Sequence, residues 1–561
     1  MKVAETIGHD ILVVGGGLAG MTAAIEAKRA GADVALISKV HPIRSHSGAA
    51  QGGINAAIKT DDNWRDHMYD TVKGGRFLND QDATRILCQE AASGIEWLHS
   101  LGVVFSRNPD GTLAQRPFGG QRRNRTCFAA DHTGHNILHV LYETILRCGV
   151  PVYEETYVTA LLTDSRRFGG LMSIDLLRGR LVLFRSKACI LATGGAGRVF
   201  GQSSNALINT GDGVALAWRA RLPIEDMEFF QIHPTGLLNG ILMTEGIRGE
   251  GGYLVNALGE RFMERYSPQF KELAPRDVVS RAIQNEINEG RGFPGQYVHL
   301  DLRHLGEARI NERLPQIREI AIHFGGVDPV HEPIPIRPTV HYTMGGIATD
   351  TDGRTVCAGL YAAGECACVS VHGANRLGGN SLLETIVYGR RSGRAAARES
   401  SGAPCAGESA VQAAARDEER RLSELLARED GESVADLRTA METLVQRNFG
   451  LFKNESDMQK GLQKLLALRE RYGRVIVQDK SLLYNLNLVH ALELGAMLDV
   501  ALLLATASLW RKESRGSHYR TDFPHCDNRG FLKHSMLTRA KDSTAVLSTK
   551  PVTIEDIQPE D

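Results

Sequence analysis

The sequence predicts an α/β, Rossmann-like nucleotide-binding domain with an inserted α+β domain, followed by a helical bundle and a small C-terminal domain. Three observations favour this fold class. The chain opens with a short apolar run, a glycine-rich turn and an Ala-rich stretch; strand-to-glycine steps recur near residues 190 and 360; and the composition changes sharply after Pro404. At roughly 150 residues per domain, the 561 residues correspond to about three or four domains.

The start of the chain predicts a β-α-β unit. A short apolar run ends at Gly15, an Ala-rich stretch follows from Leu18 to Ala30, and a second apolar run covers residues 34–37. Similar steps at 189–195 and 359–365 indicate one nucleotide-binding layer assembled from separated stretches of chain. The residues between these steps contain strands and turns of their own. The expected domains are therefore a discontinuous nucleotide-binding domain, 1–232 and 343–405, and an inserted domain, 233–342.

The residues beyond Pro404 predict helices. From Val411 to Ala427 the pattern is mostly Ala, Glu, Arg and Leu, and apolar residues recur at three- and four-residue spacing from Val434 to Val445. We expect a helical bundle at 406–515 and a polar, aromatic C-terminal region at 516–561. The longest apolar run, Val500 to Trp510, is shorter than the roughly 18 residues of a membrane span, so we expect a soluble chain.

Charge and cysteine content exclude several classes of function. Lys and Arg number 65 and Asp and Glu 66, which gives a formal net charge of −1, so nucleic acid is an unfavoured partner. The nine cysteines include no CxxC pair, which argues against a disulfide framework and against an iron-sulfur site in this chain. Met1 to Asp10 has no basic and apolar leader pattern, so we expect the mature protein to begin there.

The glycine-rich turn predicts a dinucleotide site. Gly15, Gly17 and Gly20 stand in a G-x-G-x-x-G pattern between a strand and a helix, where glycine lets a pyrophosphate approach the backbone and the helix N-terminus favours its charge. The alternative is a tight turn without a ligand. The acidic residue that NAD-binding domains carry about twenty residues later is absent, because the second strand ends at Ser38-Lys39. Simple NAD binding is therefore disfavoured.

Residues 38–53 carry a family resemblance. The stretch S-K-V-H-P-I-R-S-H-S-G-A-A-Q-G-G resembles the flavoprotein subunit of succinate dehydrogenase and fumarate reductase. In that family the histidine of the R-S-H-[ST] motif holds FAD through a covalent bond to the 8α-methyl carbon, and here this position is His46. The resemblance runs nearly end to end, and the FAD-binding residues that it implies are Gly15, Gly17, Gly20, Ser38, Lys39, Ser45, His46, Ser47, Gln51, Gly52, Gly53, Asp212, Glu365, Ser381 and Leu382.

Each of these residues also has an alternative interpretation. A lone histidine such as His46 is more often a hydrogen-bonded structural residue. Asp212 and Glu365 could be a helix cap and a buried ion-pair partner. Cys366 and Cys368, which flank Glu365, we interpret as small buried residues without chemistry.

The same resemblance implies a site for a four-carbon dicarboxylate. Two anionic groups require two clusters of cationic or donor side chains. The resemblance assigns one carboxylate to His233 and Thr244, which stand in the segments Q-I-H-P-T and L-M-T-E-G-I-R-G-E-G-G. It assigns the other carboxylate to His341 and Arg376, in the segments H-Y-T-M-G-G and H-G-A-N-R-L-G. Residues 233–342 resemble the family's capping domain, which closes over the substrate.

The resemblance assigns proton transfer to an arginine. In A-P-R-D-V-V-S-R this residue is Arg276, which exchanges the proton on the carbon next to the hydride, with a relay through Glu245 and Arg248. The assignment conflicts with the usual arginine pKa of about 12.5 or more, which makes proton abstraction harder to explain than proton donation. Each residue taken alone could also be a surface arginine, a core histidine or a threonine cap.

The resemblance implies an enzyme that interconverts succinate and fumarate by hydride transfer with covalent FAD. Electrons would pass to or from an iron-sulfur protein subunit and a quinone-reactive membrane anchor, so the chain would lie peripherally on the cytoplasmic side of the membrane. Residues 511–524 resemble the family's helical-domain ending near that subunit, or form a solvated charged turn. The alternatives are an L-aspartate oxidase-type flavoenzyme and a catalytically inactive flavin-binding scaffold.

Overall fold

The nucleotide-binding layer is a parallel sheet of five strands in the order β18-β11-β2-β3-β7. The computed structural model that shows it describes residues 1–164 and 166–560. β2, β11 and β18 precede the three glycine steps and lie next to one another, which confirms that one layer is assembled from separated stretches. The bounds are β2 (Ile11–Val14), β3 (Val34–Ile37), β7 (Val152–Tyr153), β11 (Ala188–Leu191) and β18 (Leu360–Ala362).

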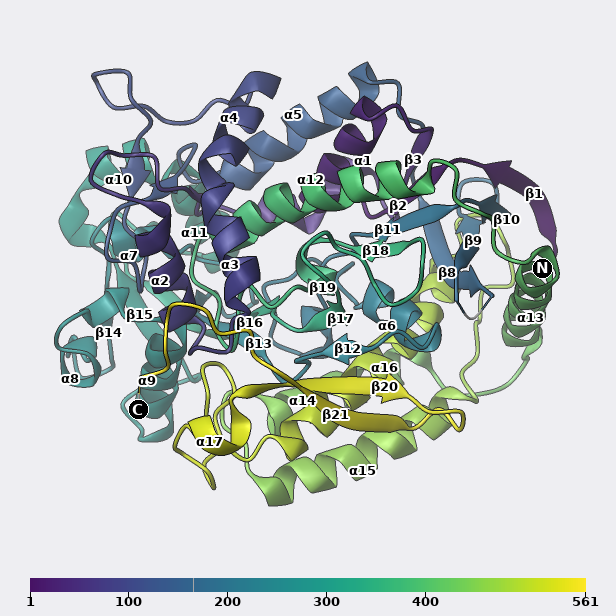
Figure 1. The fold of residues 1–561 in the computed structure, drawn as a ribbon. Coiled ribbons are helices and arrows are strands. Elements are labelled where there is room, and N and C mark those ends of the chain that lie inside the picture. Colours follow the sequence, from purple (N-terminus) through teal and green to yellow (C-terminus); the bar gives the residue numbers. More distant parts are fainter. Residues whose placement is uncertain (165, 561) are drawn as a thin grey trace.

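Three helices cover one face of this sheet: α1 (Leu18–Arg29), α5 (Thr133–Arg147) and α12 (Asn380–Ser400). α1 and α12 run side by side, and α5 packs against α1 (Figure 1). The approach is close because α12 carries a glycine at the crossing, where a Cβ on Gly393 would lie 2.3 Å from the carbonyl oxygen of Ala23. This packing fixes α1 and, with it, the glycine-rich turn at its N-terminus.

A second sheet, which we did not predict, packs on the other face of the first. Its order is β1-β10-β9-β8, with β1 and β10 parallel and the other pairs antiparallel. Ile11 and Val13 face the helices, whereas Leu12 and Val14 join the core that the second sheet shares, as strand alternation requires. The bounds are β1 (Val3–Gly8), β8 (Thr156–Thr163), β9 (Phe168–Asp175) and β10 (Arg180–Arg185).

The inserted unit has an antiparallel sheet in the order β13-β16-β15-β14 and a hydrophobic cluster of its own between Leu237 and Ile336. The predicted boundaries at 233 and 342 fall within β13 and β16, which pair with each other. Figure 1 shows this unit in teal at the left. The bounds are β13 (Phe230–Gly236), β14 (Tyr253–Val255), β15 (Val298–Asp301), β16 (Ile334–Thr343), α7 (Gly246–Gly249), α8 (Met263–Tyr266), α9 (Arg276–Asn288), α10 (Glu307–Arg313) and α11 (Pro315–Gly325).

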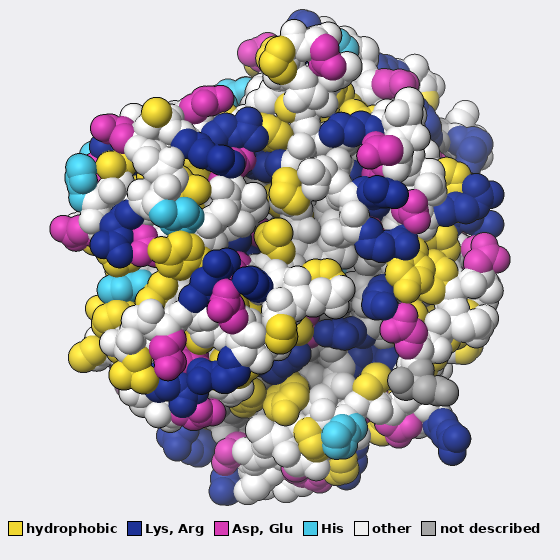
Figure 2. All heavy atoms as spheres, turned by 90° about the vertical axis from the view of Figure 1, so that its left-hand side faces the viewer, with side chains coloured by type: hydrophobic (Ala, Val, Ile, Leu, Met, Phe, Trp, Pro, Cys, Tyr) yellow, Lys and Arg dark blue, Asp and Glu magenta, His cyan; other side chains and the backbone are white. Residues whose placement is uncertain are grey.

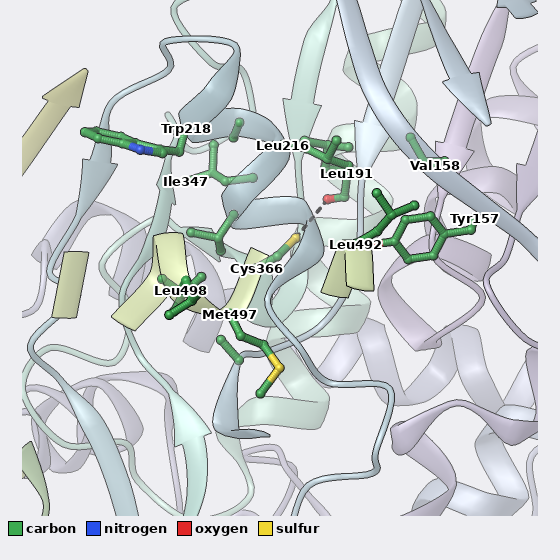
Figure 3. Close-up of a cluster of buried hydrophobic side chains, with 14 of the residues drawn as sticks. Tyr157, Val158, Leu191, Leu216, Trp218, Ile347, Cys366, Leu492, Met497 and Leu498 are labelled. Carbon is green, nitrogen blue, oxygen red and sulfur yellow. Dashed lines mark hydrogen bonds between the residues drawn. The ribbon is translucent and has the colours of Figure 1, made fainter. Parts of the chain in front are cut away.

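Four helices of the described chain lie within 406–515, where we predicted a helical bundle: α13 (Glu408–Ala427), α14 (Val434–Phe449), α15 (Glu455–Tyr472) and α16 (Leu486–Trp510). The apolar run is longer than expected, since α16 has 25 residues and is long and apolar enough to cross a membrane by length and composition. However, 89% of its most apolar window is buried within the protein, which is typical of a core helix. Figure 3 shows Leu492, Met497 and Leu498 of α16 packed among side chains from β8, β11 and α6 (Asp212–Arg219).

The thiol of Cys366 lies in the same cluster (Figure 3) and donates to the carbonyl oxygen of Leu191 at 3.2 Å. Cys366 is fully buried and Cys368 is 3% exposed. Burial raises the pKa of both thiols, so neither forms a ready nucleophile. These contacts support the interpretation of both residues as packing groups.

The C-terminal region closes the molecule on the side opposite α12 (Figure 1). The hairpin of β20 (Lys533–Arg539) and β21 (Ala545–Pro551) extends a mixed sheet with the order β19-β17-β12-β20-β21. The other members are β12 (Ile224–Glu225), β17 (Gly346–Ala348) and β19 (Ala367–Cys368), and α17 (Asn528–Phe531) precedes the hairpin. The remaining elements of the described chain are β4 (Ile54–Asn55), β5 (Gln115–Arg116), β6 (Thr126–Cys127), α2 (Trp64–Gly74), α3 (Gln81–Gln89) and α4 (Ala91–Leu101).

The charged segment 511–524 is not a solvated turn. The side chains of Arg511, Glu513 and Arg515 are at most 1% exposed, and Glu513 pairs with both arginines at 2.9 and 2.8 Å. Arg520 is also fully buried. The alternative of an exposed turn is therefore wrong for this part of the segment. On the face that carries the inserted unit, by contrast, charges of both signs are interspersed (Figure 2).

Candidate functional site

One continuous cavity of about 600 Å³ joins the glycine-rich turn to the inserted unit. It brings together nearly all the side chains that the sequence singled out, although they come from both domains. Two predicted residues, Gly20 and Arg248, lie outside its lining. The predicted residues that line it are Gly15, Gly17, Ser38, Lys39, Ser45, His46, Ser47, Gln51, Gly52, Gly53, Asp212, His233, Thr244, Glu245, Arg276, His341, Glu365, Arg376, Ser381 and Leu382.

The glycines at one end of the cavity are required by close backbone contacts. Gly15 has φ +123°, and a Cβ there would lie 2.0 Å from the carbonyl oxygen of Ala192. A Cβ on Gly20 would lie 1.9 Å from the carbonyl oxygen of Gly15, which explains why Gly20 matters without touching the cavity. Gly17 caps α1 without a side chain, so the first N–H groups of the helix face the cavity and suit a pyrophosphate.

Lys39 takes the place of the acidic residue of NAD-binding domains and holds two carboxylates. Its Nζ lies 2.6 Å from Asp212 and 2.7 Å from Glu493 of α16. Burial alone would lower the pKa of Lys39, but the two carboxylates outweigh it and raise the pKa above its usual value. Asp212 is the first residue of α6, but the N-cap is Gly211 and no side chain caps the helix, so the helix-cap alternative for Asp212 is wrong. Its carboxylate pairs with Lys39 beside the cavity instead.

His46, which the resemblance expects to hold the flavin, lines the cavity. Its Nδ1 accepts a hydrogen bond from the backbone N–H of Ala206 at 3.3 Å, which assigns any ring proton to Nε2. Burial and then the charge of Arg198 lower the pKa of His46 to about 4, so the ring is neutral at pH 7. Next to it, Ser47 Oγ accepts the N–H of Leu18 at 3.2 Å and ties this loop to the start of α1.

Unpartnered polar atoms in the lining fit a polar cofactor. Buried side-chain atoms normally form hydrogen bonds. Around this cavity, however, Ser45 Oγ, Gln51 Oε1, Thr193 Oγ1 and Asn209 Nδ2 have none to the rest of the described chain. Together with the glycine-rich turn and the N-terminus of α1, they fit a dinucleotide such as FAD.

Glu365 is partly buried in the cavity lining and accepts the backbone N–H of Thr343 at 3.0 Å. Burial raises the pKa of Glu365 to about 7. Within 4 Å no described cation pairs with it, so the predicted alternative of a buried ion-pair partner is wrong. A carboxyl group that titrates near neutrality inside a cavity is typical of a functional site.

The two histidines of the predicted dicarboxylate site face each other, with ring centroids 5.1 Å apart. His233 Nδ1 accepts the N–H of Thr235 at 3.2 Å, so Nε2 carries the proton. That Nε2 is buried and has no partner among the described residues. His341 Nδ1 lies 2.9 Å from Ser204 Oγ. Burial, with the nearby arginines, lowers the pKa of both rings well below 6.5, so both rings are neutral at pH 7.

Thr244 and Arg376 complete the two clusters. Thr244 is 3% exposed, and its Oγ1 accepts the N–H of Gly246 at 3.2 Å, which leaves its hydroxyl hydrogen to donate elsewhere. The guanidinium of Arg376 lies 4.5 Å above the ring of Tyr342, donates to Ser381 Oγ at 3.2 Å, and has an Nε with no described partner. Burial and Arg276 lower the pKa of Arg376 to about 9, so it stays charged at pH 7.

Arg276, Glu245 and Arg248 form a connected buried group. Arg276 is the first residue of α9, and its Nε and Nη2 both lie 2.7 Å from Glu245 Oε2. Arg248 Nη2 lies 3.8 Å from the other carboxylate oxygen, and its Nη1 donates to the carbonyl of Glu272. Burial alone would raise the pKa of Glu245, but the two guanidinium groups outweigh it and lower the pKa. Burial lowers the pKa of Arg248, which Glu245 opposes only in part.

Sequence reasoning missed four residues that shape this site. Gln231 accepts from Arg276 Nη1 at 3.0 Å, and Gly119 donates its N–H to Glu245 Oε1 at 2.7 Å. Ser204 and Glu493 hold His341 and Lys39, as described above. Gln231 could have been found, since it stands in the quoted Q-I-H-P-T segment. The other three lie in segments without a motif, and only the fold brings them to the cavity.

Comparisons with known proteins agree with this geometry. The FAD binding domain family matches residues 10–382, and the fumarate reductase flavoprotein C-terminal family matches residues 438–561. The fumarate reductase flavoprotein subunit of Mycobacterium tuberculosis is 45% identical over 573 residues, 98% of either chain. The succinate dehydrogenase flavoprotein subunit of Rickettsia bellii is 44% identical and covers 98% of this chain and 96% of its own. A mutant of Escherichia coli quinol fumarate reductase is 42% identical, with a TM-score of 0.97 and 99% of each chain covered.

The fold, the glycine-rich cavity and the first of these matches define an FAD-binding flavoprotein. Over nearly the full length, the chain is 44 to 45% identical to the two named subunits, which is enough to identify the family of flavoproteins to which it belongs. The chain belongs to the family of succinate dehydrogenase and fumarate reductase flavoprotein subunits.

Proposed function

We propose that this protein is the catalytic flavoprotein subunit of an enzyme that interconverts succinate and fumarate. The observation that carries the proposal is the charge at the inner end of the cavity. Arg276 and Arg376 line it and Arg248 lies behind them, which brings three positive charges, and Glu245 pairs with Arg248 and Arg276. Glu365, whose charge acts on Arg376, adds only part of a charge because burial raises its pKa to about 7. The remaining excess of between one and two positive charges in a low-dielectric cavity suits a dianion.

The chain's own side chains can hold both ends of such a substrate. FAD, when bound, supplies the hydride acceptor or donor. His233 Nε2–H and the Thr244 hydroxyl are free to donate to one carboxylate, and Arg376 with His341 to the other. Arg376 can bind a carboxylate through two parallel hydrogen bonds. Positioning by both clusters would leave the two central carbons of the acid next to Arg276.

Proton transfer is proposed for Arg276, with Glu245 and Arg248 behind it. A proton that leaves the Arg276 guanidinium can be replaced along the 2.7 Å contact with Glu245, and Arg248 reaches the other oxygen of the same carboxylate. The burial that lowers the pKa of Arg248 makes this exchange easier. Arg276→Ala, assayed with reduced dye and fumarate in FAD-loaded protein, should therefore lose at least about a hundredfold in rate. An undiminished rate would overturn this assignment, and lack of turnover in the unmutated protein would favour the inactive scaffold.

Covalent attachment of FAD at His46 is the second part of the proposal. It is supported by the neutral ring, whose Nδ1 is occupied by the Ala206 N–H and whose Nε2 remains available in the cavity lining. After denaturation and acid precipitation, flavin fluorescence should stay with the polypeptide, and in His46→Ser it should move to the supernatant. His132→Ser, at a ring that is 44% exposed outside the cavity, is the control and should keep its flavin. Release of all flavin from the unmutated protein would contradict covalent attachment.

The alternative of an L-aspartate oxidase-type enzyme gains no support, since the relatives above carry fumarate reductase or succinate dehydrogenase names. The site also favours a dianion, whereas L-aspartate brings an ammonium group that would meet the excess positive charge. Parallel dye assays with succinate and L-aspartate would decide between them. Turnover of L-aspartate alone would reverse the conclusion.

Electron transfer requires partner subunits. We propose an iron-sulfur protein and a quinone-reactive anchor that place the chain peripherally on the cytoplasmic side of the membrane. The support is that the two curated relatives are named subunits and that the Escherichia coli protein is named a quinol fumarate reductase. Affinity purification of the tagged protein from detergent-solubilised membranes should recover an iron-containing partner in stoichiometric amount. Recovery of the chain alone from the membrane-free fraction would argue against this assembly.

A further inference from the structure

A second cavity of about 460 Å³ lies apart from the first, at the junction of three parts of the chain. Gln284, Gln296 and Arg337 reach it from the inserted unit, and Gly201 and Gln202 from the nucleotide-binding domain. α14 supplies the remaining wall. The lining residues are Gly201, Gln202, Gln284, Gln296, Arg337, Pro338, Thr443, Gln446 and Arg447. We call it the junction groove.

The junction groove is lined by hydrogen-bond donors and positive charge. It contains two arginines, Arg337 and Arg447, four glutamines and a threonine, and its lining residues include no Asp or Glu. Glu442, one turn before Gln446 on α14, is held by Arg438 at 2.8 Å. Neither groove arginine forms an ion pair with a described residue. Positive charge without an acidic partner, surrounded by amides, is the environment that an anion with several oxygens requires.

Arg337 is the stronger indication of an anion site, because its guanidinium is half-buried and only some of its N–H groups have acceptors. Its Nη2 donates to Gln202 Oε1 at 2.6 Å and to the carbonyl oxygen of Leu238 at 2.6 Å. Its Nε is buried and meets no acceptor in the described structure. Burial lowers the pKa of Arg337, and no neighbouring carboxylate opposes this. A guanidinium that loses water without gaining a counter-ion is costly unless a ligand supplies the charge.

A strand and a loop that line the junction groove also carry residues of the first cavity. Arg337 and His341 lie on the same strand, β16. Gln202 precedes Ser204, which holds His341 at 2.9 Å, and Ala206, whose N–H holds His46. The backbone N–H of Gln202 in turn donates to Gln446 Oε1 of α14 at 3.2 Å. A ligand that draws Arg337 and Arg447 together would therefore act on the loop that positions both histidines.

We propose that the junction groove is a second anion-binding site, which takes a small molecule with several carboxylate or phosphate oxygens and clamps the inserted unit to α14. The binding site stands on its own geometry; its effect on turnover rests on the function proposed above. Because the groove joins three segments, occupancy should stabilise the protein and change the KM of the main reaction.

The test is calorimetric titration of the FAD-loaded protein with citrate and, separately, with inorganic phosphate. We expect one of these anions to bind at a site that Arg447→Gln weakens by at least about tenfold. Arg447 is an exposed helix residue, so this substitution should leave the fold intact. Arg416→Gln is the matched control, since Arg416 is also exposed on a helix and has no described ion pair; it should bind as the unmutated protein does.

The controls separate this site from the first cavity, which can itself attract anions. Binding in the first cavity would be lost in Arg376→Gln and kept in Arg447→Gln, and binding in the junction groove would show the reverse. Tighter binding of citrate would identify a polycarboxylate ligand, and tighter binding of phosphate a phosphate-bearing one. Identical affinity and stoichiometry in the unmutated protein and Arg447→Gln, for both anions, would overturn the site. An anion effect on KM that is equal in both proteins would overturn the coupling, even if the main reaction proceeds normally.

Discussion

Gln231 provides the sharpest test of how Arg276 is held. Its side chain is 1% exposed and does not line the cavity, yet it connects three parts of the site. Oε1 accepts from Arg276 Nη1 at 3.0 Å, and Nε2 donates to Asn375 Oδ1 at 3.0 Å and to the carbonyl of Arg376 at 2.7 Å. Gln231→Met keeps the length of the side chain and removes all three hydrogen bonds.

The expected loss can be worked from these contacts. A hydrogen bond to a charged group contributes about 1.5 to 3 kcal/mol. If Arg276 depends on this bond for its orientation at the substrate, kcat/KM should fall by about 10- to 150-fold, since about 1.4 kcal/mol is a factor of ten. The fall should appear mainly in kcat, because Gln231 contacts the guanidinium of Arg276, the proposed proton-transfer group, but only the backbone carbonyl of Arg376 and not its guanidinium.

Dye-linked assays of succinate oxidation and fumarate reduction would measure both constants, with the FAD content checked by absorbance. Gln81→Met is the matched control. Gln81 is also 1% exposed and hydrogen-bonded, to the chain near Ile557 at 2.6 Å, but it lies away from the cavity. It should lose stability without a change in kcat/KM. A Gln231→Met protein that binds FAD and keeps kcat/KM within about twofold would refute the reasoning.

Two further predictions concern the cofactor end and the pH dependence of stability. Gly20→Ala should abolish FAD retention, because the new Cβ would lie 1.9 Å from the carbonyl oxygen of Gly15. Retention is measured as the absorbance of bound FAD at equal protein concentration. Gly31→Ala is the control: Gly31 has φ +89° and open space around it, so this variant should lose only about 1 kcal/mol of folding stability and keep FAD. Burial and then Arg125 lower the pKa of His67 to about 4 in the folded protein. As the pH falls below about 6.5, His67 is protonated in the unfolded chain but stays neutral in the folded protein. Protonation of His67 therefore lowers the free energy of unfolding by about 2 kcal/mol between pH 7 and pH 5. Urea unfolding of His67→Gln should show a smaller loss over that range, and an unchanged loss would contradict the buried neutral ring.

The parts of the fold that follow from local sequence were predictable. β2, α1 and β3 are set by an apolar run, a glycine turn and an Ala-rich stretch, and the helices after residue 405 by three- and four-residue spacing. The sheet of β12, β17, β19, β20 and β21 was not predictable in this way. Ile224 pairs with Leu537 across more than half of the chain, and a two-residue strand such as β12 has no periodicity to detect.

The site was predictable to the extent that its residues stand in motifs. His233, Arg276 and Arg376 lie in recognisable segments, and the fold places them around one cavity. Glu493 has no such signal, because it is one of two acidic residues on a mostly apolar helix and stands in no motif. Its function at Lys39 depends on how α16 packs against the nucleotide-binding domain, which is a property of the tertiary structure and not of the neighbouring residues.

In the proposed function, the protonation of the site residues separates substrate binding from proton transfer. Burial and neighbouring arginines keep the pKa of His233 and His341 well below 6.5, so neither ring gains charge between pH 6 and pH 8. Arg376, with a pKa of about 9, stays positive over the same range. The guanidinium groups carry the positive charge and the imidazoles stay neutral, so their part of the attraction for a dianion is constant over this range. Glu365, with a pKa of about 7, gains negative charge as the pH rises, so the attraction should weaken between pH 6 and pH 8. In the roles proposed above, Arg276, Glu245 and Arg248 exchange protons while Arg376 keeps its charge.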